Sequence, residues 1–177
     1  MRNADWLSLF RIAAAPLVAL CLRWGNPLGA TAIFGLAALS DGLDGYLARR
    51  QGPTSHGLWL DLLADKVLIL TTTALLAGLR ALPIWVPLFV GGRELAIAGL
   101  RVALRKQGLL LPPDRWGKAK MATLCLGIGG LLLARALLVP FPLYRPAYGL
   151  LLLGTALTLL SGVNYGLKAW RLLRRRR

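Results

Sequence analysis

Four aspartates are the residues of this sequence whose type and spacing could do chemistry. Asp41 and Asp44 are three positions apart, and Asp61 and Asp65 are four positions apart. Side chains at these intervals share one face of a helix, so two neighbouring antiparallel helices would bring the four carboxylates together. A site that offers oxygen ligands, and neither nitrogen nor sulfur, suits Mg²⁺ or Mn²⁺ rather than zinc. We therefore expect a divalent-cation site at these aspartates.

The elements that would position the aspartates are apolar. Of the 177 residues, 56% are hydrophobic, and the mean hydropathy is +0.60. Apolar runs of about 20 residues have the length that a helix needs to cross a bilayer. We predict an all-α integral membrane protein with six transmembrane helices and a single domain over residues 1–177. The expected spans are residues 7–23, 28–49, 58–79, 84–104, 118–139 and 147–170.

The charge of the chain indicates the kind of partner and the orientation. The net charge is +15, yet the basic residues lack interleaved aromatics and cluster at the ends of apolar runs, so we expect phospholipid headgroups and no nucleic acid as the anionic partner. Lys and Arg concentrate in the loops on the side of Met1, whereas the other side has mainly Arg23, Arg80 and Arg145. Because positive loops stay in the cytoplasm, we predict cytoplasmic termini, a cytoplasmic-facing polar active site and a location in the bacterial inner (cytoplasmic) membrane.

Two alternatives to a metal site follow from the expense of placing carboxylates in hydrocarbon. An ionised carboxylate there costs about 2.5 to 3.5 kcal/mol or more, so the aspartates need a partner of some kind. They could form ion pairs with Arg49, Arg50 and Lys66, or they could be the proton or cation sites of a coupled membrane transporter. A competing function that would keep the metal site is that of a metal-dependent prenyltransferase, whose aspartate motifs normally lie well apart in sequence.

The small and basic residues near the aspartates favour a diphosphate ligand. Gly45 and Gly57 remove side chains at positions where a ligand could approach the carboxylates. Arg49 beside a divalent-cation site implies an anion between the two, and a diphosphate has that character. A transporter would not need these residues in register. The alternative for Gly45 is close helix packing, which is also what we expect of Gly127 to Gly130.

The order of these residues resembles a known signature. It runs Asp41, two residues, Asp44, Gly45, two residues, Ala48, Arg49, seven residues, Gly57, three residues, Asp61, three residues, Asp65. This resembles the signature of the CDP-alcohol phosphotransferases, a family with six membrane helices and a cytoplasmic-facing site. The resemblance implies transfer of a phosphatidyl group from CDP-diacylglycerol to an alcohol with release of CMP, and it implies a homodimer.

The resemblance also implies roles for individual residues. Asp41, Asp44, Asp61 and Asp65 would hold two cations, Mg²⁺ or Mn²⁺, and Asp65 would also be the base that accepts the proton of the acceptor hydroxyl. Gly45, Ala48, Arg49 and Gly57 would contact the CDP moiety. Such a two-cation site can neutralise a diphosphate and stabilise the CMP that leaves.

Two further stretches bear on the acceptor alcohol. The runs GGRELAIAGLR, at 91–101, and RWGKAK, at 115–120, resemble the branch of the family that makes phosphatidylglycerol phosphate from glycerol 3-phosphate. Arg93, Arg101 and Lys118 would then bind the acceptor phosphate, with Arg105 as a further candidate. The alternative for Arg93 is an ion pair with Glu94 or with the aspartates. Inositol phosphate is the alternative acceptor, because it offers the same phosphate to the same cationic groups.

Overall fold

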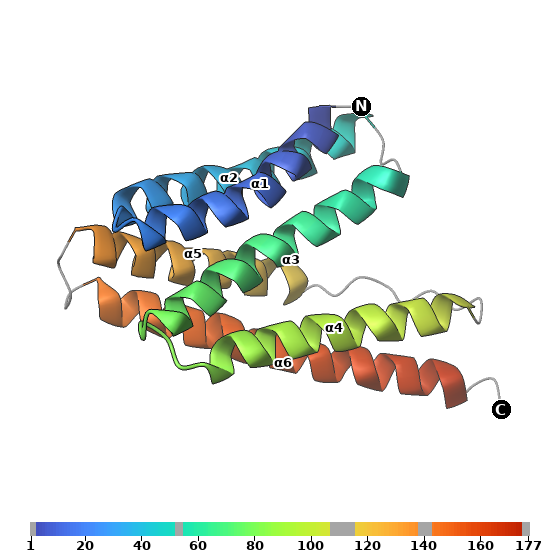
Figure 1. Cartoon of the computed structure of the whole chain (residues 1–177). Helices are drawn as coiled ribbons and strands as arrows, with labels where there is room; N and C mark the ends of the chain where they lie inside the picture. The colour runs from blue at the N-terminus through green and yellow to red at the C-terminus, as the bar shows by residue number, and fades with distance from the viewer. Residues whose placement is uncertain (1–2, 52–54, 107–115, 138–142, 175–177) are drawn as a thin grey trace.

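The computed structural model describes residues 3–51, 55–106, 116–137 and 143–174, and every regular element within these ranges is a helix (Figure 1). The helices are α1 (Asn3–Arg23), α2 (Pro27–Gln51), α3 (Ser55–Gly78), α4 (Trp85–Lys106), α5 (Trp116–Ala136) and α6 (Tyr144–Arg174). Each expected span overlaps one of them. The largest difference is at α6, which is longer than the expected 147–170 because its helix continues into the basic C-terminal segment. For the residues in these ranges, the prediction of an all-α fold is confirmed.

The turn between α1 and α2 shows why the chain breaks where its sequence predicts. Gly25 adopts a left-handed conformation, with a φ of 71°, and so ends α1 in the geometry that glycine favours. The side-chain oxygen of Asn26 accepts a hydrogen bond from the Gly29 N–H at 2.9 Å and thereby caps α2. Pro27 follows at the first helical position, where the missing N–H removes no helical hydrogen bond.

Successive helices run in opposite directions, so both termini lie at one end of the bundle and the α1–α2 and α3–α4 turns lie at the other (Figure 1). Helix α1 packs against both α2 and α3. The most extensive packing is between α5 and α6, while α5 also contacts α2 and α4 lies against α6. Helix α5 therefore links the α1–α2 hairpin to the α4–α6 side of the molecule.

Glycines set the close approach of α5 and α6. A Cβ atom on Gly127 would lie 2.6 Å from the backbone nitrogen of Leu151, and one on Gly130 would lie 2.7 Å from the Cβ of Ala147. Separations this short leave no room for a methyl group without moving a helix. The prediction that the glycines of 127–130 permit close packing is confirmed.

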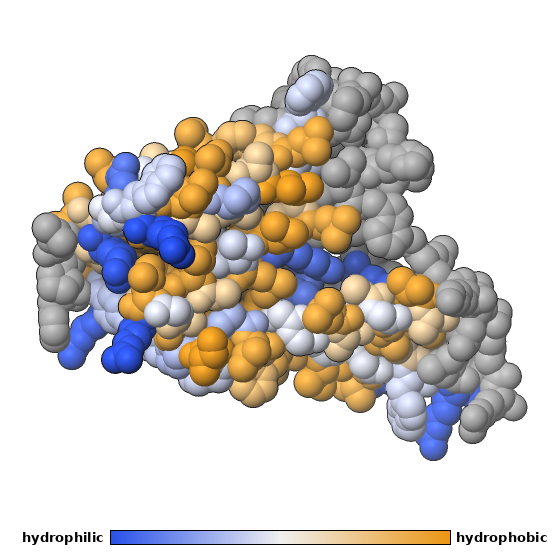
Figure 2. Space-filling view, in the orientation of Figure 1, coloured by the Kyte–Doolittle hydropathy of each residue, from blue (hydrophilic) through white to orange (hydrophobic). Residues whose placement is uncertain are grey.

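Hydrophobic residues cover much of the outside of the bundle as well as its core. Leu39, Leu88 and Leu95 are exposed by 69%, 66% and 74%. Figure 2 shows apolar side chains over much of the visible face, with hydrophilic atoms in a hollow between α3 and α4. Among the described residues, two stretches are long and apolar enough to cross a membrane, Ala119–Ala136 in α5 and Tyr144–Arg171 in α6. This surface fits a membrane-associated protein, while the six crossings stay a prediction.

Candidate active site

The aspartate signature lies on two consecutive helices. Asp41, Asp44, Gly45, Ala48 and Arg49 belong to the second half of α2, and Gly57, Asp61 and Asp65 belong to the first half of α3. The described structure includes the helical backbone of these residues but not their side chains. The predicted metal and CDP contacts therefore lie outside the described part and stay predictions.

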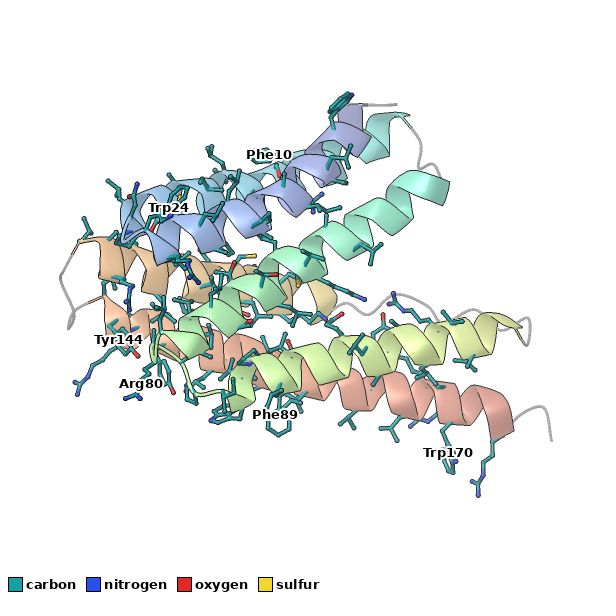
Figure 3. All side chains as sticks on the ribbon, viewed as in Figure 1. Phe10, Trp24, Arg80, Phe89, Tyr144 and Trp170 are labelled. Carbon is teal, nitrogen blue, oxygen red and sulfur yellow. The ribbon has the colours of Figure 1, made fainter. Side chains whose placement is uncertain are left out.

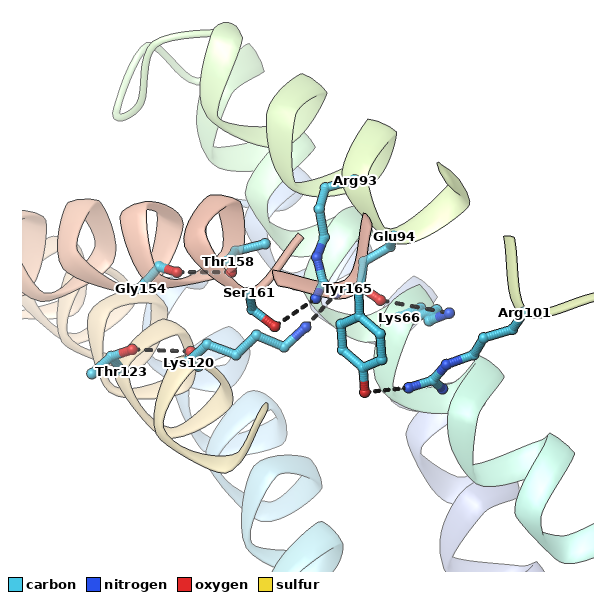
Figure 4. Close-up of polar contacts among 10 residues, drawn as sticks. All are labelled: Lys66, Arg93, Glu94, Arg101, Lys120, Thr123, Gly154, Thr158, Ser161 and Tyr165. Carbon is cyan, nitrogen blue, oxygen red and sulfur yellow. Dashed lines mark hydrogen bonds and ion pairs between the residues drawn. The ribbon is translucent and has the colours of Figure 1, made fainter. Parts of the chain in front are cut away.

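Lys66, one residue after Asp65, has a described side chain, and it belongs to a cluster of charges. The carboxylate of Glu94, on α4, accepts hydrogen bonds from Arg93 Nη1 at 2.6 Å and from Lys120 Nζ at 2.7 Å (Figure 4). Its second oxygen lies 3.5 Å from Lys66 Nζ. Three helices, α3, α4 and α5, thus contribute Lys66, Arg93, Glu94 and Lys120, which we call the Glu94 cluster.

Helix α6 completes the surroundings of the arginines on α4. Arg93 Nη2 donates a hydrogen bond to the Ser161 hydroxyl at 2.8 Å, and Arg101 Nη2 donates one to the Tyr165 hydroxyl at 2.8 Å. The guanidinium of Arg101 also lies 5.1 Å from the centroid of the Tyr165 ring, within cation–π distance. A Cβ on Gly162 would lie 3.1 Å from Arg93 Cγ, so the glycine makes room for the arginine stem.

The Glu94 cluster is largely buried, so solvent screens its charges poorly, and its cations outnumber its carboxylate. The side chains of Arg93, Lys120, Glu94 and Lys66 are 8%, 10%, 16% and 27% exposed. Three cations share one carboxylate, so the four side chains carry two more positive than negative charges. In a weakly polarisable interior such an excess favours an anion of matching charge.

Two buried donors also lack partners. The Nε atoms of Arg93 and Arg101 have no hydrogen-bond acceptor within the described residues. Buried donors in folded proteins are nearly always satisfied, so unsatisfied ones at a polar site point to a ligand or to water. Both nitrogens belong to arginines for which the sequence predicts contact with an anion.

The outcome for the predicted acceptor residues differs from residue to residue. Arg93 and Arg101 both make contacts with α6, and the ion pair of Arg93 with Glu94, which was the alternative for Arg93, is present. The side chains of Lys118 and Arg105 lie outside the described part. Pairing of Arg93 with Glu94 does not test whether Arg93 also contacts the acceptor, and that role stays a prediction.

Sequence reasoning missed several members of this site. It treated Lys66 as a partner for the aspartates, it included Lys120 only within the run at 115–120, and it gave no role to Ser161 or Tyr165. The available signals were a single glutamate in an apolar span and a lysine two residues after Lys118. Neither signal shows which helices are neighbours.

The sequence comparisons agree on one family. The model of the family described as CDP-alcohol phosphatidyltransferase matches residues 1–161. A Mycobacterium tuberculosis (strain CDC 1551 / Oshkosh) protein named "Probable phosphatidylglycerophosphate synthase" is 34% identical over 176 residues, which cover 95% of this chain and 81% of that protein. A Bacillus subtilis (strain 168) protein named "CDP-diacylglycerol--glycerol-3-phosphate 3-phosphatidyltransferase" is 30% identical over 186 residues, covering 95% of each chain.

A relative with a different printed activity is about as similar. The "Cardiolipin synthase (CMP-forming)" of Oryza sativa subsp. japonica is 33% identical over 187 residues, which cover 94% of this chain and 57% of that protein. The identities alone therefore do not separate the two activities. The match over residues 1–161, together with these relatives, shows that the chain belongs to the CDP-alcohol phosphatidyltransferase family.

Proposed function

We propose that this protein transfers the phosphatidyl group of CDP-diacylglycerol to glycerol 3-phosphate, giving phosphatidylglycerol phosphate and CMP. Relatives that carry the name of this reaction support the proposal. The observation that carries it is the contact of Lys66 with Glu94 at 3.5 Å. Lys66 directly follows Asp65, so a buried cluster with excess positive charge adjoins the end of the aspartate signature.

The reaction is a displacement at phosphorus. A hydroxyl oxygen of the acceptor forms a bond to the phosphorus that carries diacylglycerol, and the bond from that phosphorus to the oxygen of CMP breaks. CMP leaves with the electron pair, and the hydroxyl proton passes to the carboxylate of Asp65. Gly45, Ala48, Arg49 and Gly57 hold the CDP moiety in this proposal.

The donor set on α2 and α3 fits two divalent cations. Asp41, Asp44, Asp61 and Asp65 supply carboxylate oxygens alone, which is the set that Mg²⁺ and Mn²⁺ prefer. Bound cations of this kind offset the charge of a diphosphate and of the departing CMP. Without them, four neighbouring carboxylates would repel both each other and the substrate.

The acceptor phosphate fits the cationic groups of α4 and α5. Arg93, Arg101 and Lys118 bind it in this proposal, and Lys120 of the Glu94 cluster adds a fourth cation. The unpartnered Nε atoms of Arg93 and Arg101 offer donors to phosphate oxygens. Charge-assisted hydrogen bonds are worth about 1.5 to 3 kcal/mol each, so glycerol, which lacks the phosphate, should be a very poor acceptor.

The same proposal covers the setting of the enzyme. All six helices cross the bacterial inner membrane as one domain, both termini are cytoplasmic, and the site opens to the cytoplasm. Both termini at one end of the bundle fit an even number of crossings, and the apolar outer surface supports the membrane location. A homodimer belongs to the proposal through the family resemblance.

A competition among acceptors tests the proposal with purified full-length protein. CDP-diacylglycerol would be offered with glycerol 3-phosphate, inositol 1-phosphate, serine, glycerol and phosphatidylglycerol together, and the lipid product and CMP would be identified. We expect phosphatidylglycerol phosphate to dominate. Inositol phosphate as the preferred acceptor would keep the cationic pocket and overturn the choice of alcohol, while serine, glycerol or phosphatidylglycerol would overturn the pocket. Transport activity without CMP release would overturn the whole assignment.

A further inference from the structure

The turn that ends α3 holds an arginine in a conformation that favours glycine. Arg80 has a φ of 57°. Its N–H donates to the carbonyl of Ala77 at 3.0 Å, and the N–H of Ala81 donates to the carbonyl of Leu76 at 2.9 Å. This is the Schellman motif, in which the residue after the helix is usually glycine. The left-handed backbone conformation of Arg80 therefore carries an energetic penalty that glycine would avoid. Residues in such unfavourable conformations are a reason to look for a function.

The first turn of the same protein shows the ordinary solution. After α1, Asn26 N–H donates to the carbonyl of Cys21 at 2.8 Å, and Gly25 N–H donates to the carbonyl of Leu22 at 3.3 Å. The motif is the same, and glycine occupies the left-handed position there. The same turn at the same end of the bundle can therefore be made with glycine, so its geometry does not require an arginine at position 80.

Arg80 lies at the rim of an open cavity of about 360 Å³ between the α3–α4 turn and α6. Leu82 and Pro83 give the cavity an apolar side, and Tyr144 and Tyr148 form its α6 side. Figure 3 shows Arg80 and Tyr144 at this end of the bundle. The two tyrosine rings stack with centroids 5.9 Å apart, and the Tyr144 hydroxyl donates to the carbonyl of Ala81 at 2.8 Å. The walls are thus held in place before any ligand arrives.

The charge of this end of the bundle can attract an external anion. Arg80 is exposed, and its guanidinium has no hydrogen bond or ion pair with the part of the chain that the structure describes. The sequence contains no Asp or Glu in residues 23–27, 78–85 or 136–144, which join the helices at this end. Arg23, Arg135 and Arg145 lie in the terminal turns of α1, α5 and α6. The end is cationic, and no acidic residue of these segments offsets it.

The surroundings of the cavity favour a phospholipid headgroup as the anion. Trp24 and Trp85, which begin or end the neighbouring helices, are exposed by 76% and 41%, and exposed tryptophans at helix ends mark the membrane interface. An arginine fork can bind phosphate through two parallel hydrogen bonds, while the apolar and aromatic walls suit the glyceryl and upper acyl carbons.

We propose that the cavity of Arg80, Tyr144 and Tyr148 binds the phosphate of an anionic phospholipid in the leaflet opposite the active site. The inference relies on the proposed membrane location and on no catalytic residue. The lipid would connect the α3–α4 turn to the first turns of α6. The positive φ of Arg80 is the conformation that brings the guanidinium to the rim.

Arg80→Gly is an unusually clean test, because it removes the cation and also relieves the left-handed arginine. Binding of phosphatidylglycerol to the purified full-length protein would be counted by native mass spectrometry in the absence of CDP-diacylglycerol. We expect Arg80→Gly and Arg80→Gln to raise the Kd of the tightest-bound lipid by about tenfold or more. In lipid-free detergent the unfolding temperature of Arg80→Gly should be equal to or above that of the parent.

Three comparisons decide the result. Arg23→Gln removes another exposed arginine at the same end that does not line the cavity, and it should bind the lipid as the parent does. Equal loss in Arg23→Gln, or unchanged binding by Arg80→Gly, overturns the site. Displacement of the lipid by an equal concentration of inorganic phosphate would overturn the lipid as the ligand. Since no turnover is measured, an error in the proposed reaction would not change these readings.

Discussion

Lys120 and Glu94 lie on different helices, 26 residues apart in the chain, and Lys120 Nζ is 2.7 Å from Glu94 Oε1. The carboxylate also pairs with Arg93 at 2.6 Å and lies 3.5 Å from the ammonium of Lys66. A single acid therefore holds cations from three helices. Removing the acid and removing one cation should have different consequences, and this difference can be measured.

Glu94→Gln should weaken the fold and make it dependent on anions. An amide at this position removes the carboxylate that three largely buried cations share, and after allowance for partial exposure we expect a loss of about 2 kcal/mol in the free energy of unfolding. Inorganic phosphate should recover part of the loss by binding the native state. Thermal unfolding in detergent, with and without phosphate, measures both effects. Equal recovery with chloride at the same ionic strength would argue against a specific anion site.

Lys120→Gln should affect the acceptor more than the donor lipid. Loss of one charge-assisted contact to the acceptor phosphate should raise the KM for glycerol 3-phosphate by about tenfold or more. The KM for CDP-diacylglycerol should change by about twofold at most, because a different set of residues is proposed to hold CDP. Arg171→Gln, an exposed charge near the end of α6, serves as the control. A parallel rise in both KM values would contradict the assignment of Lys120.

Asp65→Asn should lower turnover by about 100-fold or more, because the amide cannot accept the proton of the acceptor hydroxyl. CMP release from CDP-diacylglycerol is the measurement, and Asp5→Asn is a control that removes an acid outside the signature. Excess chelator should abolish activity in the parent, and added Mg²⁺ or Mn²⁺ should restore it. Near-normal turnover of a folded Asp65→Asn variant would exclude Asp65 as the base.

Gly127→Ala should loosen the α5–α6 contact. Its new methyl group would meet the backbone of Leu151 at 2.6 Å, and overpacking of this kind costs about 1 to 3 kcal/mol. Gly149→Ala, in α6, is the matched control, because nothing lies within 4 Å of its added Cβ. That variant should be neutral or slightly more stable, since alanine is the better helix former. Similar unfolding temperatures for the two variants would show that α5 and α6 can move apart at Gly127 without loss of stability, and would contradict the prediction.

Much of the fold follows from local features of the sequence. Apolar runs of the right length predict the helices, and glycine, asparagine and proline at 25–27 predict the turn that the structure contains. The glycines at 127–130 predict close helix packing in the same way, although they do not specify α6 as the partner helix. These features depend on residues near each other in the chain, so their physics can be read before the fold is known.

The polar site also combines features that depend on local spacing with contacts that depend on which helices become neighbours. The aspartate signature depends on spacing within two consecutive helices, and its side-chain roles stay predictions. The contacts of Glu94 depend on which helices become neighbours, and no spacing in the sequence specifies that α3, α4 and α5 meet at one carboxylate. Only the pair of Arg93 with Glu94 was foreseeable, as one of two alternatives, because the two residues are adjacent.

In the proposed six-helix membrane topology, the position of the Glu94 cluster has a consequence for how the chain is inserted into the membrane during synthesis. Helix α4 brings Arg93 and Glu94 together, so these opposite charges can enter the bilayer as a pair, which lowers the insertion cost of each. Lys120 arrives later with α5 and finds its carboxylate already present, and Ser161 arrives last with α6. The nascent chain therefore exposes fewer unmatched polar groups with each helix that follows α4, and release of the last helix is the step at which Arg93 gains its hydroxyl partner.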